Sequence, residues 1–148
     1  MNLIVDASIL VEANRIERSE VRPWITRLLD RDRLYVVQNL TLLEVASGLR
    51  RLEQTGEISA QWGETALLRM YEFPGTREVV TQAMIRRVWE LRQSVTVYDA
   101  AYVALTEKIH AETGGRARLI TADGKLARSP QVKALTYLWP RDRHTALP

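Results

Sequence analysis

Four carboxylates lie inside or just after short apolar runs of this chain, where an acidic side chain is costly to bury: Asp6, Glu44, Asp99 and Asp123. An unpaired carboxylate in an apolar environment loses several kcal/mol of solvation or takes up a proton. A divalent cation shared by converging acids would remove that cost. The four residues therefore predict a metal-dependent hydrolytic site, provided that the fold brings them together.

The donor types favour a hard cation. Carboxylate oxygens with no cysteine in the chain and no nearby histidine select Mg²⁺, or Mn²⁺ as a substitute, over zinc. Such an ion can activate a water for attack on phosphorus and stabilise the charge on the phosphoryl oxygens. Phosphodiester hydrolysis at this site would need no side-chain nucleophile.

Length and composition predict a single domain over residues 1–148, with a polar C-terminal tail over 140–148. The sequence has neither a long apolar segment nor a basic N-terminal stretch followed by one, so we expect no membrane span and no signal peptide. We therefore expect a cytoplasmic protein. The absence of cysteine excludes disulfides, thiolate zinc sites and a cysteine nucleophile.

The net charge is +3 although four acids are assigned to one site, so the remaining surface must be positive. That asymmetry favours a polyanionic partner. Arginines greatly outnumber lysines among the 21 basic residues, which suits phosphate binding but can equally reflect the base composition of a genome. The arginines are scattered, and the sequence alone defines no basic patch.

The spacing of apolar residues predicts short strands alternating with helices. We expect strands over 1–5, 34–37, 70–73, 118–120 and 132–138, and helices over 8–14, 20–30, 41–53, 59–69, 77–93 and 96–110. This alternation is typical of an α/β fold, a three-layer α/β/α sandwich around a mainly parallel sheet. Ligands bind beyond the carboxyl ends of such strands, and Asp6 and Asp123 both follow one.

Four segments together resemble the successive motifs of PIN-domain ribonucleases: residues 3–8, 42–49, 98–105 and 119–126. Within that family, the chain is most similar to the VapC-like toxin component of VapBC-type toxin–antitoxin pairs. The resemblance extends from residue 3 to about residue 127, and all four acids occur in the family's order. It implies a metal-dependent endoribonuclease with a PIN-like fold, restrained by a VapB-like antitoxin that occupies the active cleft.

The resemblance also implies roles for individual residues. It assigns the metal to Asp6, Glu44, Asp99 and Asp123, with Asp6 and Asp99 as the first choices for direct ligands. Ser8 and Thr121 match small hydroxyl positions beside the first and last acids, where they could orient a carboxylate or a water.

Each acid also has a structural explanation when it is taken alone. Asp6 could cap a helix, Asp99 could complete a capping box begun by Thr96, and Asp123 begins a common turn dipeptide. Glu44 has the weakest such explanation, because its predicted helix looks mostly buried. The occurrence of all four acids in one order is what favours a site.

Other functions remain open at this point. The alternative to an enzyme is a non-catalytic PIN-like module that binds RNA or protein. A phosphoacceptor receiver domain is a poor match, because Ala7 and Ser8 follow Asp6 where such domains carry a second acid. We expect the tryptophans, Tyr98 and Tyr102 to pack against other residues rather than stack on bases.

A homodimer is also expected. Some apolar side chains of the first two predicted helices could face a second copy or an antitoxin, although burial in the core is the default: Leu10, Val11, Trp24, Ile25, Leu28 and Leu29.

Overall fold

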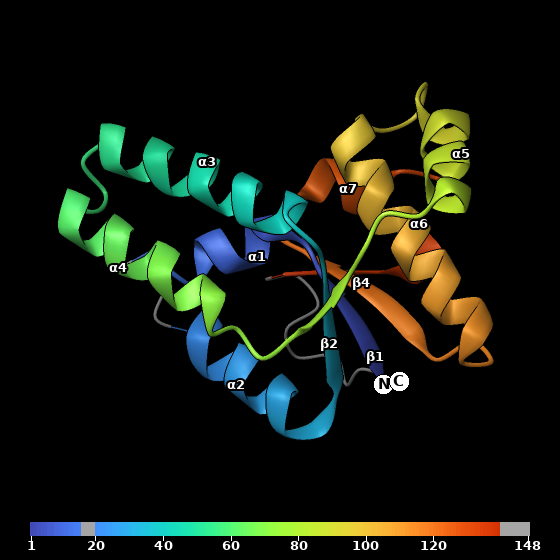
Figure 1. The fold of residues 1–148 in the computed structure, drawn as a ribbon, viewed down its shortest axis with the longest axis horizontal. Helices are drawn as coiled ribbons and strands as arrows, with labels where there is room; N and C mark the ends of the chain where they lie inside the picture. Colours follow the sequence, from blue (N-terminus) through green and yellow to red (C-terminus); the bar gives the residue numbers. More distant parts are fainter. Residues whose placement is uncertain (16–19, 140–148) are drawn as a thin grey trace.

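The computed structural model describes residues 1–15 and 20–139, whose strands form one parallel sheet. The strands have the order β3-β2-β1-β4-β5, so the first strand of the chain lies in the middle (Figure 1). They are β1 (Asn2–Val5), β2 (Arg33–Val37), β3 (Thr76–Glu78), β4 (Ala117–Thr121) and β5 (Thr136–Leu138). In register, Ile4 of β1 lies between Tyr35 of β2 and Leu119 of β4.

Helices cover both faces of the sheet. One layer contains α1 (Ala7–Glu12), α2 (Val21–Arg31), α3 (Leu40–Gln54) and α4 (Ala60–Tyr71), and the other contains α5 (Gln82–Leu91), α6 (Val97–Glu112) and α7 (Gly124–Arg128) (Figure 1). Side chains alternate between the faces of a strand. Leu3 and Val5 consequently pack with the first layer, and Ile4 packs with the second. The predicted three-layer α/β/α sandwich is confirmed.

The third strand lies later in the chain than the sequence predicted. We expected a strand over 70–73, but α4 continues through Tyr71, and β3 occupies Thr76–Glu78. β3 is an edge strand with polar, mostly exposed side chains. It therefore lacks the apolar run by which a buried strand is recognised in a sequence.

Two other predicted elements are shorter than expected. The helix predicted over 77–93 corresponds to α5. Its N-cap is Thr81, whose hydroxyl accepts a hydrogen bond from the Met84 backbone N–H in the first turn of the helix. The strand predicted over 132–138 is reduced to β5, with a 3-10 turn, η1 (Lys133–Leu135), before it. The tail predicted over 140–148 lies outside the described residues.

The carboxyl ends of β1, β2 and β4 meet at one edge of the sheet because the strands are parallel. There the Asp6 backbone N–H donates to the carbonyl oxygen of Ile120 at 3.0 Å, which fixes the end of β1 against β4. Asn39, with a positive φ of 62°, turns the chain from β2 into α3 at the same edge. Three chain segments thus leave the sheet side by side.

Helix α6, which begins near this edge, is buried on nearly all sides. In α6, every residue from Ala100 to Thr106 is buried, as expected for a helix packed between the sheet and α5. This burial fixes the first turn of α6, which carries Asp99, beside the strand ends. Within the described ranges, no helix is long and apolar enough to cross a bilayer.

Candidate active site

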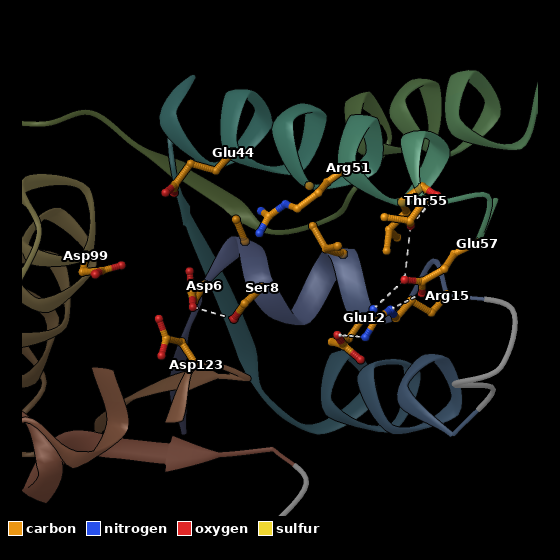
Figure 2. Close-up of a pocket in the computed structure, with 14 residues that line it drawn as sticks. Asp6, Ser8, Glu12, Arg15, Glu44, Arg51, Thr55, Glu57, Asp99 and Asp123 are labelled. Atoms are coloured by element: carbon orange, nitrogen blue, oxygen red, sulfur yellow. Dashed lines mark hydrogen bonds and ion pairs between the residues drawn. The ribbon is translucent and has the colours of Figure 1, made fainter. Parts of the chain in front are cut away.

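The structure brings the four sequence-predicted acids to one pocket, with a volume of about 380 Å³, at the carboxyl edge of the sheet. Asp6 follows β1, Glu44 lies in α3, Asp99 lies in the first turn of α6, and Asp123 caps α7. Figure 2 shows their side chains converging from these four segments around the same space. Residues that are up to 117 positions apart in the chain, as Asp6 and Asp123 are, therefore share one site.

Asp6 is the most deeply placed of these acids, with 5% of its surface exposed. Its Oδ2 accepts two hydrogen bonds from hydroxyl groups, one from Ser8 Oγ at 2.6 Å and a short one from Thr121 Oγ1. Each hydroxyl also accepts a backbone N–H bond at 2.9 Å, Ser8 from Ala122 and Thr121 from Asp123. The orientation of the Asp6 carboxylate is thus set by the first turn of α1 and the end of β4.

Glu44 is held by a tyrosine from the other side of the sheet. Tyr102 Oη donates to Glu44 Oε2 at 2.7 Å and lies 3.1 Å from Thr41 Oγ1. Thr41 Oγ1 in turn accepts from the Val37 backbone N–H at 3.1 Å. A chain of hydrogen bonds therefore runs from the end of β2 to the Glu44 carboxylate.

Asp99 and Asp123 each combine a local capping role with their place in the pocket. Asp99 Oδ2 accepts from Thr96 Oγ1 at 2.7 Å, and the Thr96 oxygen accepts the Asp99 backbone N–H at 3.1 Å. Asp123 Oδ1 accepts the backbone N–H groups of Lys125 and Leu126 at 2.7 and 3.2 Å. Local structural roles are therefore confirmed for Asp99 and Asp123, but the Asp6 side chain makes no cap hydrogen bond to α1, so the capping explanation for Asp6 is wrong. Capping does not exclude a function.

Burial and mutual repulsion raise the pKa of three of the acids. Burial is the largest cause for Asp6, and the charge of Asp99 adds to it. Burial also raises the pKa of Glu44, followed by the charges of Asp6 and Asp99. For Asp99, burial is again first, and the Asp123 charge adds to it while Lys125 opposes it. The protein alone thus leaves these carboxylates short of positive charge.

A divalent cation would supply that charge, and the donor set fits one. The pocket offers carboxylate oxygens from four segments, which is the ligand type of Mg²⁺ or Mn²⁺. In their present positions, no three acidic or histidine side chains among residues 1–15 and 20–139 form a ready-made metal-binding group. The fit therefore rests on the chemistry of the donors and on the raised pKa values.

The environment of Glu44 differs in one respect from the sequence analysis. Its helix was expected to be mostly buried, but Leu43 is 68% exposed, and only one face of α3 is covered. That face approaches α1 closely at Gly48, where a β-carbon would collide with Val11 Cγ2. Because the two helices lie so close, Glu44 and Asp6 open onto the same pocket.

The sequence analysis did not assign a positioning role to Tyr102. It lies three residues after Asp99 in α6, and Thr41 lies three residues before Glu44 in α3. Residues three apart share one face of a helix. This spacing is a signal that could have indicated both residues as neighbours of the site.

The apolar residues of the first two helices mostly belong to the core. Leu10, Trp24, Ile25 and Leu28 are buried, which confirms the default expectation for them. Of the two tyrosines expected to pack, Tyr102 is fully buried, whereas Tyr98 is exposed.

Comparison with known proteins decides the family. The model of the PIN domain matches residues 3–131, a range that contains all four acids. The chain belongs to the PIN-domain family. This PIN domain is 34% identical over 139 residues to Ribonuclease VapC9 of Mycobacterium tuberculosis, covering 94% of the chain and 99% of that relative.

Solved PIN-domain structures have the same fold. One is VapBC2 from Rickettsia felis bound to a DNA fragment from its promoter, with a TM-score of 0.64 and 15% identity over 94% of this chain and 99% of that one. Another is VapC20 of Mycobacterium tuberculosis, a Sarcin-Ricin loop cleaving toxin, with a TM-score of 0.56 and 16% identity over 88% and 98% of the two chains. At these identities the likeness concerns the fold alone.

Proposed function

We propose that this PIN domain is a metal-dependent endoribonuclease and the toxin of a type II toxin–antitoxin system. The observation that carries the proposal is the convergence of Asp6, Glu44, Asp99 and Asp123 on one pocket. Its support from relatives is the 34% identity to a VapC ribonuclease over nearly the full length of both chains. The substrate is RNA, cleaved by hydrolysis of a phosphodiester bond.

The four acids would hold Mg²⁺, with Mn²⁺ as a substitute. When bound, such a cation activates a water and stabilises negative charge on phosphoryl oxygens. Asp6 is the best prepared of the ligands, because two hydroxyl groups already fix one of its oxygens. One oxygen of Asp123 is engaged by the first turn of α7, so this residue has less to offer a cation than Asp6 has.

The surrounding side chains orient the acids. Ser8 and Thr121 hold Asp6, and Tyr102 holds Glu44, which limits the rotamers that these carboxylates can adopt. Fixed carboxylates need less reorganisation when a cation and a phosphate arrive, and that preorganisation lowers the barrier to hydrolysis.

The partners follow from the same assignment. We infer that a VapB-like antitoxin restrains the enzyme, that the protein works in the cytoplasm and that it forms a homodimer. A second copy could cover some of the large apolar side chains that are exposed on α5 and the first turn of α6: Ile85, Trp89, Val97 and Tyr98. Sedimentation of the purified protein would show a mass of twice 17.0 kDa if the dimer forms.

The test is RNA cleavage with defined metal. Purified protein is incubated with end-labelled RNA in chelator, in Mg²⁺ and in Mn²⁺, and the experiment is repeated with Asp6→Ala and Asp99→Ala. Asp30→Ala is the matched control, since Asp30 is an exposed acid that does not line the pocket. We expect products only with metal, from the wild type and the control. Undiminished cutting by Asp6→Ala or Asp99→Ala would overturn the proposal.

The non-catalytic alternative predicts a different result. A PIN-like binding module would retain RNA tightly in the presence of metal and yield no products from any RNA tested. The presence of all four acids in the pocket favours turnover over this alternative.

A further inference from the structure

The wall that α3 contributes to the pocket carries an arginine as well as an acid. Residues of α3 that line the pocket recur at helical spacing, and they include Glu44, Gly48 and Arg51. Arg51 lies seven residues after Glu44, which corresponds to about 10 Å along the helix axis. In Figure 2 its guanidinium extends from α3 into the space between α3 and α1.

The two arginines that line the pocket differ in their partners. Arg15 is fully engaged, with Nε and Nη2 donating to Glu57 at 2.9 and 3.1 Å and Nη1 donating to Glu12 at 3.0 Å. Among the described residues, the guanidinium of Arg51 takes part in no hydrogen bond or ion pair. Its five N–H donors are therefore available to a ligand.

Arg51 is also not used as a hydrogen-bonding counter-ion by the acids. The hydroxyl groups of Ser8 and Thr121 bind Asp6, and Tyr102 binds Glu44. A guanidinium with no such partner beside a cation site can bind an anion, and the same anion can also bind the cation. Its planar fork matches phosphate oxygens, and charge-assisted hydrogen bonds of this kind are stronger than neutral ones.

Gly48 lies between these two residues and allows α1 to pack closely against α3. It lies one helical turn after Glu44 and three residues before Arg51. Because α1 approaches at this point, any larger residue would collide with Val11. Arg51 and the four acids line the same pocket, so one RNA strand can contact both.

We propose that Arg51 binds a backbone phosphate of the RNA strand and thereby positions the neighbouring linkage over the four acids. This inference rests on the proposed ribonuclease function. Arg51 acts here as a substrate-positioning residue, and its role is binding rather than proton transfer.

The experiment compares Arg51→Gln and Arg51→Lys with the control Arg50→Gln. Arg50 is the exposed neighbour in the chain and does not line the pocket. Cleavage of a short single-stranded RNA gives KM and kcat for each variant. Binding of the same RNA is measured by fluorescence anisotropy over a series of salt concentrations, with Asp6→Asn added to each variant to prevent cutting.

We expect Arg51→Gln to raise KM about tenfold with little change in kcat, because one charge-assisted contact is lost. The slope of log K against log salt concentration should fall by about 0.7, the value for one phosphate contact to a single strand. Arg51→Lys should keep the slope but bind more weakly than wild type, since it retains the charge and loses the fork. Arg50→Gln should keep a near wild-type KM.

Two results would overturn this inference and leave the proposed ribonuclease function standing. One is cleavage by the wild type together with an Arg51→Gln variant that matches Arg50→Gln in KM and in salt slope. The other is an Arg51→Gln variant whose main change is in Mn²⁺ affinity, which would make Arg51 a counter-ion of the acids. A wild type that neither binds nor cuts RNA would overturn the proposed function, and this inference with it.

Discussion

The two ends of the pocket handle charge in opposite ways. At the end formed by α1 and the turn after α3, Arg15 is paired with Glu12 and Glu57 through three hydrogen bonds. At the end formed by the strand termini, Asp6, Glu44 and Asp99 face one another, and burial and repulsion raise their pKa values. Both ends line the same cavity.

The difference shows which end of the pocket lacks positive charge. Paired charges at a surface satisfy each other and contribute little to stability. The clustered acids are instead held in place by neutral hydroxyl groups, which orient a carboxylate without neutralising it. Under the proposed function, the strand-end side of the pocket would take an external cation, and the following variants test that contrast.

Among the residues that orient the acids, the largest expected effect comes from the hydroxyl groups that hold Asp6. Ser8→Ala and Thr121→Val should each weaken Mn²⁺ binding and RNA cleavage by about 10–100-fold, the range for residues that orient metal ligands. Calorimetric titration with Mn²⁺ measures the first effect, and RNA cleavage measures the second. Ser47→Ala on the exposed side of α3 is the control. Wild-type affinity in both hydroxyl variants would show that Asp6 needs no positioning.

Removing the tyrosine hydroxyl should have a smaller effect. Tyr102→Phe leaves Glu44 and Thr41 without their shared partner, and we expect the free energy of unfolding to fall by about 1–3 kcal/mol. Cleavage should fall as well, because Glu44 can then adopt other rotamers. Urea unfolding and RNA cleavage measure the two effects. Tyr35→Phe is the matched control, since its hydroxyl bonds to Asn2 at 3.2 Å, away from the pocket. Equal effects from both variants would contradict the assigned role.

The repulsion among the acids predicts a pH dependence of stability without metal. The pKa values of Asp6, Glu44 and Asp99 are raised in the folded protein from ordinary values of 3.8, 4.5 and 3.8. The folded state therefore binds these protons more tightly than the unfolded state does. Tighter proton binding by the folded state adds to the free energy of unfolding. This contribution is fully present at a pH below the ordinary pKa values, and it is lost as the pH rises through the raised pKa values of the folded state.

In chelator, the Tm of the wild type should therefore fall relative to that of Asp6→Asn as the pH rises from 3.8 towards neutrality. Added Mg²⁺ should reduce this fall, since the cation binds the deprotonated carboxylates. Scanning calorimetry of both proteins over this pH range is the measurement. If the Tm of the two proteins changes with pH in parallel in chelator, the predicted repulsion among the acids is contradicted.

The smallest effect is expected at the paired end. Arg15→Gln breaks a partly exposed ion pair, whose side chains are 28% and 42% exposed, and should cost at most about 1 kcal/mol of unfolding free energy. It should leave Mn²⁺ affinity unchanged. A drop in affinity as large as that of Ser8→Ala would erase the distinction between the two ends.

Most of the fold and the acids of the site could be predicted from the sequence, because buried strands and helices carry apolar patterns. Asp6 and Asp123 follow such strands directly, so the parallel sheet places them at one edge. Edge strand β3 could not be found in this way. Its residues are polar, and the apolar pair Met70 and Tyr71 belongs to the end of α4 instead.

Some contacts between distant residues were beyond the sequence analysis. The bond between Tyr102 and Glu44 joins residues 58 positions apart, and their meeting depends on how α6 and α3 leave the sheet. The partners of the arginines depend on packing in the same way. Arg15 and Arg51 have the same side chain, but only the structure distinguishes the paired guanidinium from the one that has no partner among residues 1–15 and 20–139.

The most direct test of the account is metal binding by the four acids themselves. Titration calorimetry with Mn²⁺ would compare the wild type with Asp6→Asn and Asp99→Asn, and Asp30→Asn would serve as the control for removal of an acid elsewhere. We predict that the wild type and the control bind Mn²⁺ alike, and that both site variants lose more than the roughly 100-fold expected for an orienting residue. Unchanged Mn²⁺ binding by Asp6→Asn and Asp99→Asn would contradict the account.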